Sequence, residues 1–205
     1  MANEEYKMPY KIGLISTHGT GKTALVYALA GELKKRGYNV DIISEFSTKL
    51  SKQGYPINQN TNLSAQFSIL LHQMIEEISP IAKKQQCDII ITDRTVTTDN
   101  LVYLDRACSQ NPFVQKIAKF MMDYAKMYPY SRIYLLPLVG ELEKNGVRDL
   151  DKEFQHDIYI RLVKLLKDKK IKHIELPIPQ KEDFARKEWQ DIIIKNTIKD
   201  LKTKK

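Results

Sequence analysis

The chain has 205 residues, of which 42% are hydrophobic and 28% are charged. This length and composition favour one globular α/β domain over residues 1–205 and exclude a disordered protein. No apolar run approaches the ~20 residues of a membrane span, and residues 1–11 lack the apolar core of a signal peptide. The only cysteines, Cys87 and Cys108, do not indicate a disulfide framework, so we expect a cytoplasmic protein.

The net charge of +8 is concentrated near the end of the chain. Residues 161–205 hold 14 Lys and Arg against 7 Asp and Glu. Part of this charge lies on a basic C-terminal helix predicted at about 181–203. We favour a solvated helix face as its explanation and keep nucleic-acid binding as the alternative. The sequence does not decide the oligomeric state, and a homodimer is one arrangement that it leaves open.

Short apolar runs alternate with segments of helical period along the chain. Strands are predicted at 10–15, 39–44, 88–92, 131–136 and 171–176. Helices are predicted at about 22–36, 62–84, 96–127 (one or two, interrupted near Asn111 and Pro112), 151–168 and 181–202. This order predicts an α/β protein of three layers, with a five-stranded parallel sheet flanked by helices. Ligands of such sheets bind at the carboxyl ends of the strands.

A glycine-bearing loop joins the first predicted strand to the first helix. It reads Ser16-Thr17-His18-Gly19-Thr20-Gly21-Lys22-Thr23. Its glycines let backbone N–H groups surround phosphate oxygens, and the helix start adds partial positive charge. Lys22 can reach the β- and γ-phosphates, and Thr23 can supply a hydroxyl to Mg²⁺. We therefore predict a P-loop site for ATP, or another NTP, with Mg²⁺.

Two features of this loop leave alternatives open. The full pattern is G-x-x-x-x-G-K-[ST], and Ser16 stands in place of its first glycine. A glycine turn followed by an incidental Lys-Thr pair is the structural alternative. His18 either flanks the phosphates or only supports the loop.

Acidic residues end the second and third predicted strands. Asp93 is predicted to hold Mg²⁺ together with Thr23, with helix capping as the alternative. Its neighbour Arg94 is a candidate for contact with the transferred phosphate. Glu45 is predicted to be the catalytic base on the acceptor side, and its alternative is an exposed glutamate that caps the next helical turn.

Further candidates lie in a loop and on a long helix. Arg148 lies in a predicted lid at about 140–151, where it could place a cation on the developing charge; a surface arginine paired with a neighbouring aspartate is the alternative. Gln66 is the candidate that would read a nucleobase or sugar, together with His72 and Gln73. Such residues more often form the polar face of an amphipathic helix.

With these motifs in hand, the chain resembles the P-loop AAA-type ATPase/kinase family that includes the nicotinamide riboside kinase domain of NadR. It is more distantly similar to deoxynucleoside and thymidylate kinases. The resemblance covers about residues 10–170 and rests on STHGTGKT, SEF, ITDRTVTTDNLVY and NGVRDLDKEFQHDI, in this order. Members often carry an arginine after the glutamate of the second strand, where this chain has Thr48 and Lys49. The resemblance implies a kinase-like fold and phosphoryl transfer from ATP to a small nucleoside-like or nucleotide acceptor.

Four functions compete. The first is a kinase for a nucleoside-, nucleotide- or ribosyl-type small molecule, which we favour. The second is a polynucleotide 5′-hydroxyl or modified-base kinase that holds its substrate with the basic C-terminal segment; strongly salt-dependent oligonucleotide binding would distinguish it. The third is a nucleotide-dependent switch or assembly ATPase, although the N-K-x-D element of guanine-selective switches is absent from the sequence. The fourth is a nucleic-acid-binding module with a vestigial loop, but the aromatic strand motifs of RNA recognition modules are absent too.

Overall fold

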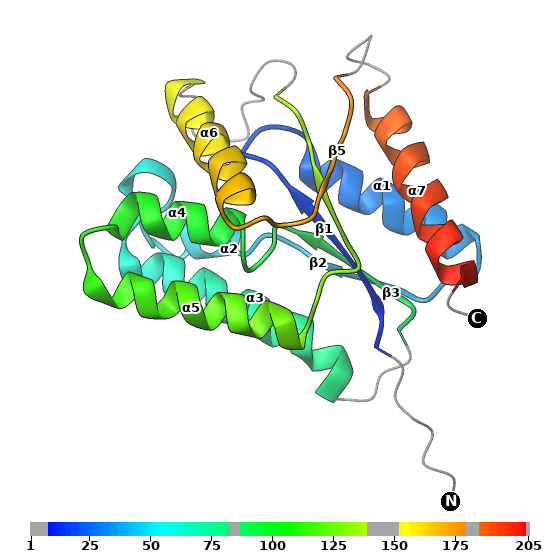
Figure 1. Cartoon of the computed structure of the whole chain (residues 1–205), viewed down its shortest axis with the longest axis horizontal. Helices are drawn as coiled ribbons and strands as arrows, with labels where there is room; N and C mark the ends of the chain where they lie inside the picture. Colours follow the sequence, from blue (N-terminus) through cyan, green and yellow to red (C-terminus); the bar gives the residue numbers. More distant parts are fainter. Residues whose placement is uncertain (1–7, 83–86, 139–151, 179–184, 204–205) are drawn as a thin grey trace, which may run out of the picture.

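The computed structural model describes residues 8–82, 87–138, 152–178 and 185–203. Figure 1 shows these elements in chain order. The strands are β1 (Tyr10–Ile15), β2 (Val40–Ile43), β3 (Ile89–Asp93), β4 (Arg132–Leu135) and β5 (Ile174–Glu175). The helices are α1 (Lys22–Lys35), α2 (Ser47–Lys52), α3 (Leu63–Ala82), α4 (Asp99–Cys108), α5 (Pro112–Met127), α6 (Lys152–Asp168) and α7 (Ala185–Thr203), with a 3₁₀ helix, η1 (Asn58–Asn60).

The strands form one parallel sheet in the order β2-β3-β1-β4-β5. β1 lies at its centre and pairs with β3 in a register that sets Leu14 opposite Asp93. All six residues of β1 are buried, as a central parallel strand requires. The five-stranded parallel sheet predicted from the sequence is thus confirmed.

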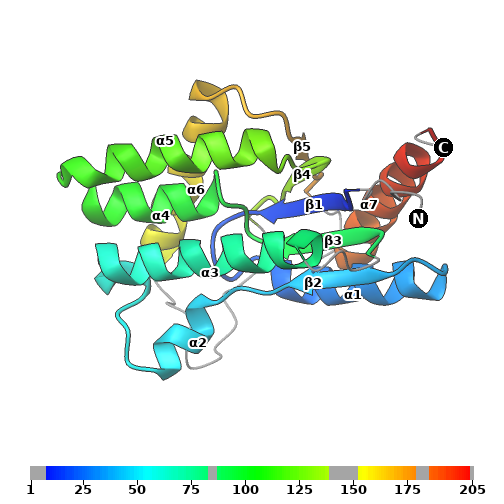
Figure 2. The same ribbon diagram turned by 90° about the horizontal axis from the view of Figure 1, so that it is seen from below.

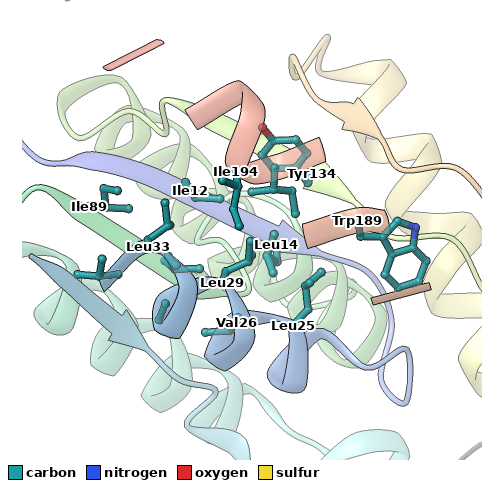
Figure 3. Close-up of a cluster of buried hydrophobic side chains, with 14 of the residues drawn as sticks. Ile12, Leu14, Leu25, Val26, Leu29, Leu33, Ile89, Tyr134, Trp189 and Ile194 are labelled. Carbon is teal, nitrogen blue, oxygen red and sulfur yellow. The ribbon is translucent and has the colours of Figure 1, made fainter. Parts of the chain in front are cut away.

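Helices cover both faces of the sheet and complete the three layers. α1 and α7 lie side by side on one face, and α3 to α6 lie on the other (Figures 1 and 2). Leu25, Leu29 and Leu33 project from α1 into a buried cluster that also receives Trp189 and Ile194 of α7 (Figure 3). This packing fixes α1 against the sheet, directly after the glycine loop.

Helix boundaries follow local signals that the sequence shows. Asn62 accepts a hydrogen bond from the backbone N–H of Ala65 at 2.9 Å and so caps the start of α3. Asn111 does the same for Phe113 at 2.9 Å, with Pro112 at the first position of α5. The predicted helical segment 96–127 is therefore two helices.

The structure differs from the prediction at both edges of the sheet. β5 is only the pair Ile174–Glu175, much shorter than the predicted strand 171–176. β2 ends at Ile43, so Glu45 lies in the connection after the strand. That connection contains α2 and η1, where no helix was predicted. The predicted lid at about 140–151 lies outside the described residues.

The C-terminal end of α7 lies far from the end of the sheet that carries the glycine loop. Near its C-terminal end, Asp200 accepts a hydrogen bond from the hydroxyl of Tyr10 at 2.5 Å. It also accepts from Nε of Arg132 at 2.6 Å and from Nη2 at 2.8 Å. Because Tyr10 and Arg132 begin β1 and β4, the basic end of α7 lies at the amino edge of the sheet (Figure 1).

The structure also bears on two expectations, one about the cysteines and one about membrane spans. Cys87 and Cys108 are both free, in agreement with the expectation that they form no disulfide. Among the described helices, none combines the length and the apolar character that crossing a membrane would need.

Candidate active site

The glycine loop leaves β1 after Ile15 and enters α1 at Lys22. Gly19 and Gly21 have φ angles of 75° and 82°, in the left-handed region that residues with side chains disfavour. The loop therefore needs glycine at these two positions to turn directly into the helix. The positive end of the α1 dipole then faces the carboxyl edge of the sheet, where an anion is favoured.

Lys22 lies against the start of the loop. Its Nζ donates hydrogen bonds to the carbonyl oxygens of Thr17 at 2.6 Å and Ser16 at 3.2 Å. Burial lowers the pKa of Lys22, although the nearby carboxylates of Asp93 and Asp99 oppose this shift. A bound phosphate would give this buried ammonium group a charged partner in place of neutral carbonyls.

Ser16 departs from the usual glycine without disturbing the loop. Its hydroxyl donates a 2.9 Å hydrogen bond to the carbonyl of Leu136, just after β4. The side chain thus points toward the neighbouring strand, and its polar group is paired although the residue is buried. The substitution leaves the phosphate-facing part of the pattern, Gly19 to Thr23, complete.

Thr23 and Asp93 meet at the mouth of the loop. The Thr23 hydroxyl donates to Oδ2 of Asp93 at 2.5 Å. Asp93 is buried, and its Oδ1 has no hydrogen-bond partner among the described residues. Burial raises the pKa of Asp93, and Lys22 opposes this shift. A hydroxyl and a carboxylate at this separation can share one ion, and such hard oxygen ligands fit Mg²⁺.

The alternative role of Asp93 as a helix cap does not fit the structure, because α4 begins six residues later, at Asp99. No group of three or more His, Cys, Asp and Glu side chains suited to a metal ion occurs in the described ranges. Mg²⁺ does not need such a group, since it usually takes one or two carboxylates together with substrate phosphates.

Glu45 and Arg94 form an ion pair across the cavity. The Ser47 hydroxyl also donates to the Glu45 carboxylate, at the start of α2. Arg94 is buried, and its guanidinium group lies 4.6 Å from the centre of the Tyr103 ring. Burial alone would lower the pKa of Arg94, but Glu45 and the other neighbouring anionic groups raise it above its ordinary value. Arg94 is therefore a permanent cation in a fixed place.

One cavity of about 290 Å³ joins these groups. Its wall comes from the glycine loop (residues 18–23), the connection after β2 (44, 45, 47 and 48), the start of η1 (57 and 58) and the end of β3 (93 and 94). The cavity thus runs from the predicted phosphate site to the Glu45–Arg94 pair. The residues predicted to bind phosphate and those predicted to act on the acceptor, which are distant in sequence, share a single space.

His18 contributes to this cavity and to a contact with α6. Its ring stacks on Phe154 with centroids 5.2 Å apart. Its backbone carbonyl accepts a 2.8 Å hydrogen bond from the side-chain amide of Gln155. Both partners lie in the first turn of α6, so this helix packs directly against the glycine loop.

The three α3 residues that were candidates for reading a nucleobase or sugar lie outside the cavity. Gln66 donates to the Thr61 hydroxyl at 2.8 Å, and His72 stacks on Phe46 with ring centroids 3.6 Å apart. Both polar ends of the Gln73 side chain bind protein groups. None of the three lines the described cavity. Arg148 lies outside the described residues.

Asp99 does not line the cavity, but it is a buried carboxylate whose charge interacts with Lys22 and Arg94, and the sequence did not single it out. It is 1% exposed, and burial raises its pKa to about 6 even though Lys22 and Arg94 oppose this shift. Thr98 donates to its Oδ1 at 2.8 Å, while Oδ2 has no hydrogen-bond partner among the described residues. The signal that could have found it is the stretch TVTTDN at residues 95–100, shortly after β3; all six of these residues are buried.

A sheet of this order, with a glycine loop between β1 and α1, defines a P-loop protein with a kinase-like α/β fold. Comparison with known proteins agrees. A family model described as "AAA domain" matches residues 11–187, and the chain belongs to this family. Among curated proteins, none matches the chain.

Several solved structures have a fold similar to that of the chain. A NadR protein in complex with NAD and AMP-PNP matches 93% of the chain with a TM-score of 0.70 and 12% identity. A NadR protein in complex with NR matches 94% with a TM-score of 0.70 and 15% identity. The chain spans about half of both NadR structures, 50% and 52%. Thymidylate kinase from Ehrlichia chaffeensis matches 91% of the chain over its own full length, with a TM-score of 0.58 and 16% identity. These neighbours confirm the kinase-like fold, and the family model confirms the suspected family.

Proposed function

We propose that the chain is an ATP- and Mg²⁺-dependent phosphotransferase whose acceptor is a nucleoside-, nucleotide- or ribosyl-type small molecule. The observation that carries this proposal is the cavity that continues from the glycine loop to Glu45 and Arg94. A nucleotide-dependent switch needs only the first part of that space. The rest of the cavity, which carries the Glu45 carboxylate, fits a bound acceptor.

The glycine loop supplies the donor site in this proposal. Backbone N–H groups of residues 19–23 and the Lys22 ammonium group bind the triphosphate. Thr23 and Asp93 would hold Mg²⁺, which when bound neutralises charge on the β- and γ-phosphates. The unpaired Oδ1 of buried Asp93 supports this assignment, because a buried carboxylate oxygen without a donor is costly.

Glu45 and Arg94 act on the acceptor side. A hydroxyl acceptor must lose a proton as it attacks, and the Glu45 carboxylate can take it. Arg94 orients that carboxylate and adds positive charge near the transferred group. We further propose that Arg148 adds a second cation from a lid at about 140–151 of a single domain.

Charge in the described part of the cavity favours a hydroxyl over a phosphate as the accepting group. Its charged residues are Lys22, Glu45, Asp93 and Arg94. In this proposal Lys22 binds the triphosphate of the donor, and Arg94 is paired with Glu45. With Asp93 assigned to Mg²⁺, an acceptor phosphate would meet the Glu45 carboxylate and no further cation along this described wall. A neutral hydroxyl meets no such repulsion.

Two further observations bear on the choice among acceptors. Beside the ATP analogue AMP-PNP, the names of the structural neighbours mention NAD, NR and thymidylate, which are nucleotides or nucleosides. A polynucleotide acceptor is less favoured, because the basic end of α7 is tied to Tyr10 and Arg132 at the far edge of the sheet. The lysines at this end of α7 therefore lie away from the cavity.

The test is a panel of acceptors with γ-labelled ATP. It contains nucleosides, nucleoside monophosphates, ribosyl cofactor precursors and 5′-hydroxyl oligonucleotides, each with the native chain and with Lys22→Ala. We expect label transfer to a nucleoside or ribosyl compound that is lost in the variant. Label released only as phosphate, with every acceptor, would contradict the proposal and favour a switch or assembly ATPase.

A further inference from the structure

A carboxylate outside the cavity is the centre of a buried network. Glu77 on α3 is 1% exposed and belongs to no part of the site described above. Its Oε2 accepts hydrogen bonds from Nζ of Lys11 at 2.7 Å and from the hydroxyl of Tyr124 at 3.1 Å. Its Oε1 accepts from the hydroxyl of Tyr130 at 2.5 Å and from Nε2 of Gln73 at 3.1 Å. Lys11 balances its charge, so Glu77 is a fully satisfied anionic acceptor.

Two of these donors reach beyond Glu77 to the turn that follows β3. Nε2 of Gln73 also donates to the backbone carbonyl of Arg94, at 2.8 Å. The hydroxyl of Tyr130 also accepts from the backbone N–H of Val96, at 3.1 Å. Glu77 therefore holds the turn from both sides of Thr95, through one side chain from α3 and another that lies just before β4.

Asp93 ends β3 and Arg94 begins the turn, and both residues line the cavity. Arg94 has a φ of 105°, a region that residues with side chains rarely adopt. Such a conformation persists only where its surroundings determine it more than once. The N–H of Arg94 donates to the carbonyl of Leu14 at 3.1 Å, which fixes one side of the residue. The bond from Gln73 fixes the other side.

We propose that Gln73 and Tyr130, anchored on Glu77, are positioning residues that hold Arg94 in its strained conformation and so direct its guanidinium group to Glu45. This inference deepens the function proposed above and rests on it for its kinetic test only. Gln73 also accepts from Nδ2 of Asn100 at 2.7 Å, which fixes the orientation of its amide. With both ends of that amide bound to protein, Gln73 acts through the backbone of Arg94 and not on a ligand.

Two tyrosines provide a matched pair of variants. Tyr130→Phe and Tyr124→Phe each remove one hydroxyl from Glu77, but only the hydroxyl of Tyr130 also binds the turn. We expect Tyr130→Phe to lower kcat about 10- to 100-fold, as small displacements of catalytic groups do, with KM for ATP unchanged. Tyr124→Phe should keep kcat within about 2-fold at a comparable loss of thermal stability. Gln73→Met, which removes the hydrogen bond to the Arg94 carbonyl, should have the same effect as Tyr130→Phe.

A second measurement needs no acceptor. In ¹⁵N-labelled protein, Tyr130→Phe should speed hydrogen exchange at the Val96 amide and shift the Nε–Hε signal of Arg94, while amides of the glycine loop stay in place. Tyr124→Phe should leave both probes unchanged. If the native chain phosphorylates no acceptor, the proposed function fails, and the Arg94 signal still decides the positioning role. Equal effects of the two tyrosine variants on that signal, or no effect of either, would overturn the inference.

Discussion

Thr23 and Asp93 lie 70 positions apart in the chain, yet the Thr23 hydroxyl donates to the Asp93 carboxylate at 2.5 Å. The sheet accounts for this contact. Leu14 of β1 lies opposite Asp93 of β3, so the end of β3 stands beside the place where the glycine loop begins. Two short sequence signals therefore become one site through the parallel pairing of their strands.

The first prediction concerns this pair. Asp93→Asn and Thr23→Ala should each weaken Mg²⁺-dependent ATP binding by about 10- to 100-fold, the loss typical when partners of a metal site are removed. Titration calorimetry with ATP, in Mg²⁺ and in EDTA, measures the effect. Asp88→Asn, which changes a carboxylate at the opposite end of β3, is the control and should bind like the native chain. Unchanged Mg²⁺ dependence in Asp93→Asn would remove Asp93 from the metal site.

The second prediction concerns Gly13, in the middle of β1. A Cβ atom at this position would lie 2.5 Å from Cγ2 of Thr95 and 3.1 Å from Cδ1 of Tyr130. Gly13→Ala should therefore destabilise the protein by about 1–3 kcal/mol, the usual effect of an overpacked core. Gly31→Ala is the control, because a Cβ there meets nothing within 4 Å and alanine favours helix α1. Urea unfolding should show opposite shifts for the two variants, and equal shifts would contradict the packing argument.

The sequence predicts the sheet, the glycine loop and Asp93 because their signals are local. A buried strand, a loop and a helix follow one another directly around Lys22, and Asp93 directly ends an apolar run. The helix caps Asn62 and Asn111 are local in the same sense, because each bonds to a residue two or three positions away.

The parts that could not be predicted depend on contacts between distant segments. The conformation after β2 depends on the ion pair of Glu45 with Arg94, 49 positions later. The polar residues of α3 looked like one amphipathic face, but Gln73 and Glu77 are buried because partners on β1, α4 and α5 satisfy them. Helical spacing gives polarity and period, and it does not reveal which polar face finds buried partners.

The third prediction concerns the pH dependence of stability. The pKa of Asp99 is raised by burial from 3.8 to about 6. Between these values the folded protein keeps a proton that the unfolded chain has lost, so stability falls as pH rises and the full penalty applies above pH ~6. Asp99→Asn removes this penalty and should add up to about 3 kcal/mol at pH ~7.5 and nothing below pH ~4. Urea unfolding of both proteins across this range tests it, and a gain independent of pH would contradict the titration of Asp99.

The fourth prediction concerns Glu45. If the acceptor is a hydroxyl, a positioned base contributes about 10²- to 10⁴-fold to the rate. Glu45→Gln should lower kcat by a factor in that range and leave ATP affinity nearly unchanged, because the glycine loop does not depend on this carboxylate. Glu45→Asp, which keeps the charge on a shorter side chain, should retain part of the activity. Steady-state kinetics with the acceptor found in the panel measure both variants.

The split between kcat and KM in Glu45→Gln separates two classes of acceptor. With a phosphate acceptor no base is needed, and loss of the carboxylate would instead release Arg94 to bind the incoming phosphate. KM for the acceptor would then fall, and kcat would change little. With a hydroxyl acceptor the loss appears in kcat, and it should shrink as pH rises because the hydroxyl then needs less help to lose its proton. A variant with native kcat and native KM would exclude Glu45 from both roles and leave it as a partner that orients Arg94.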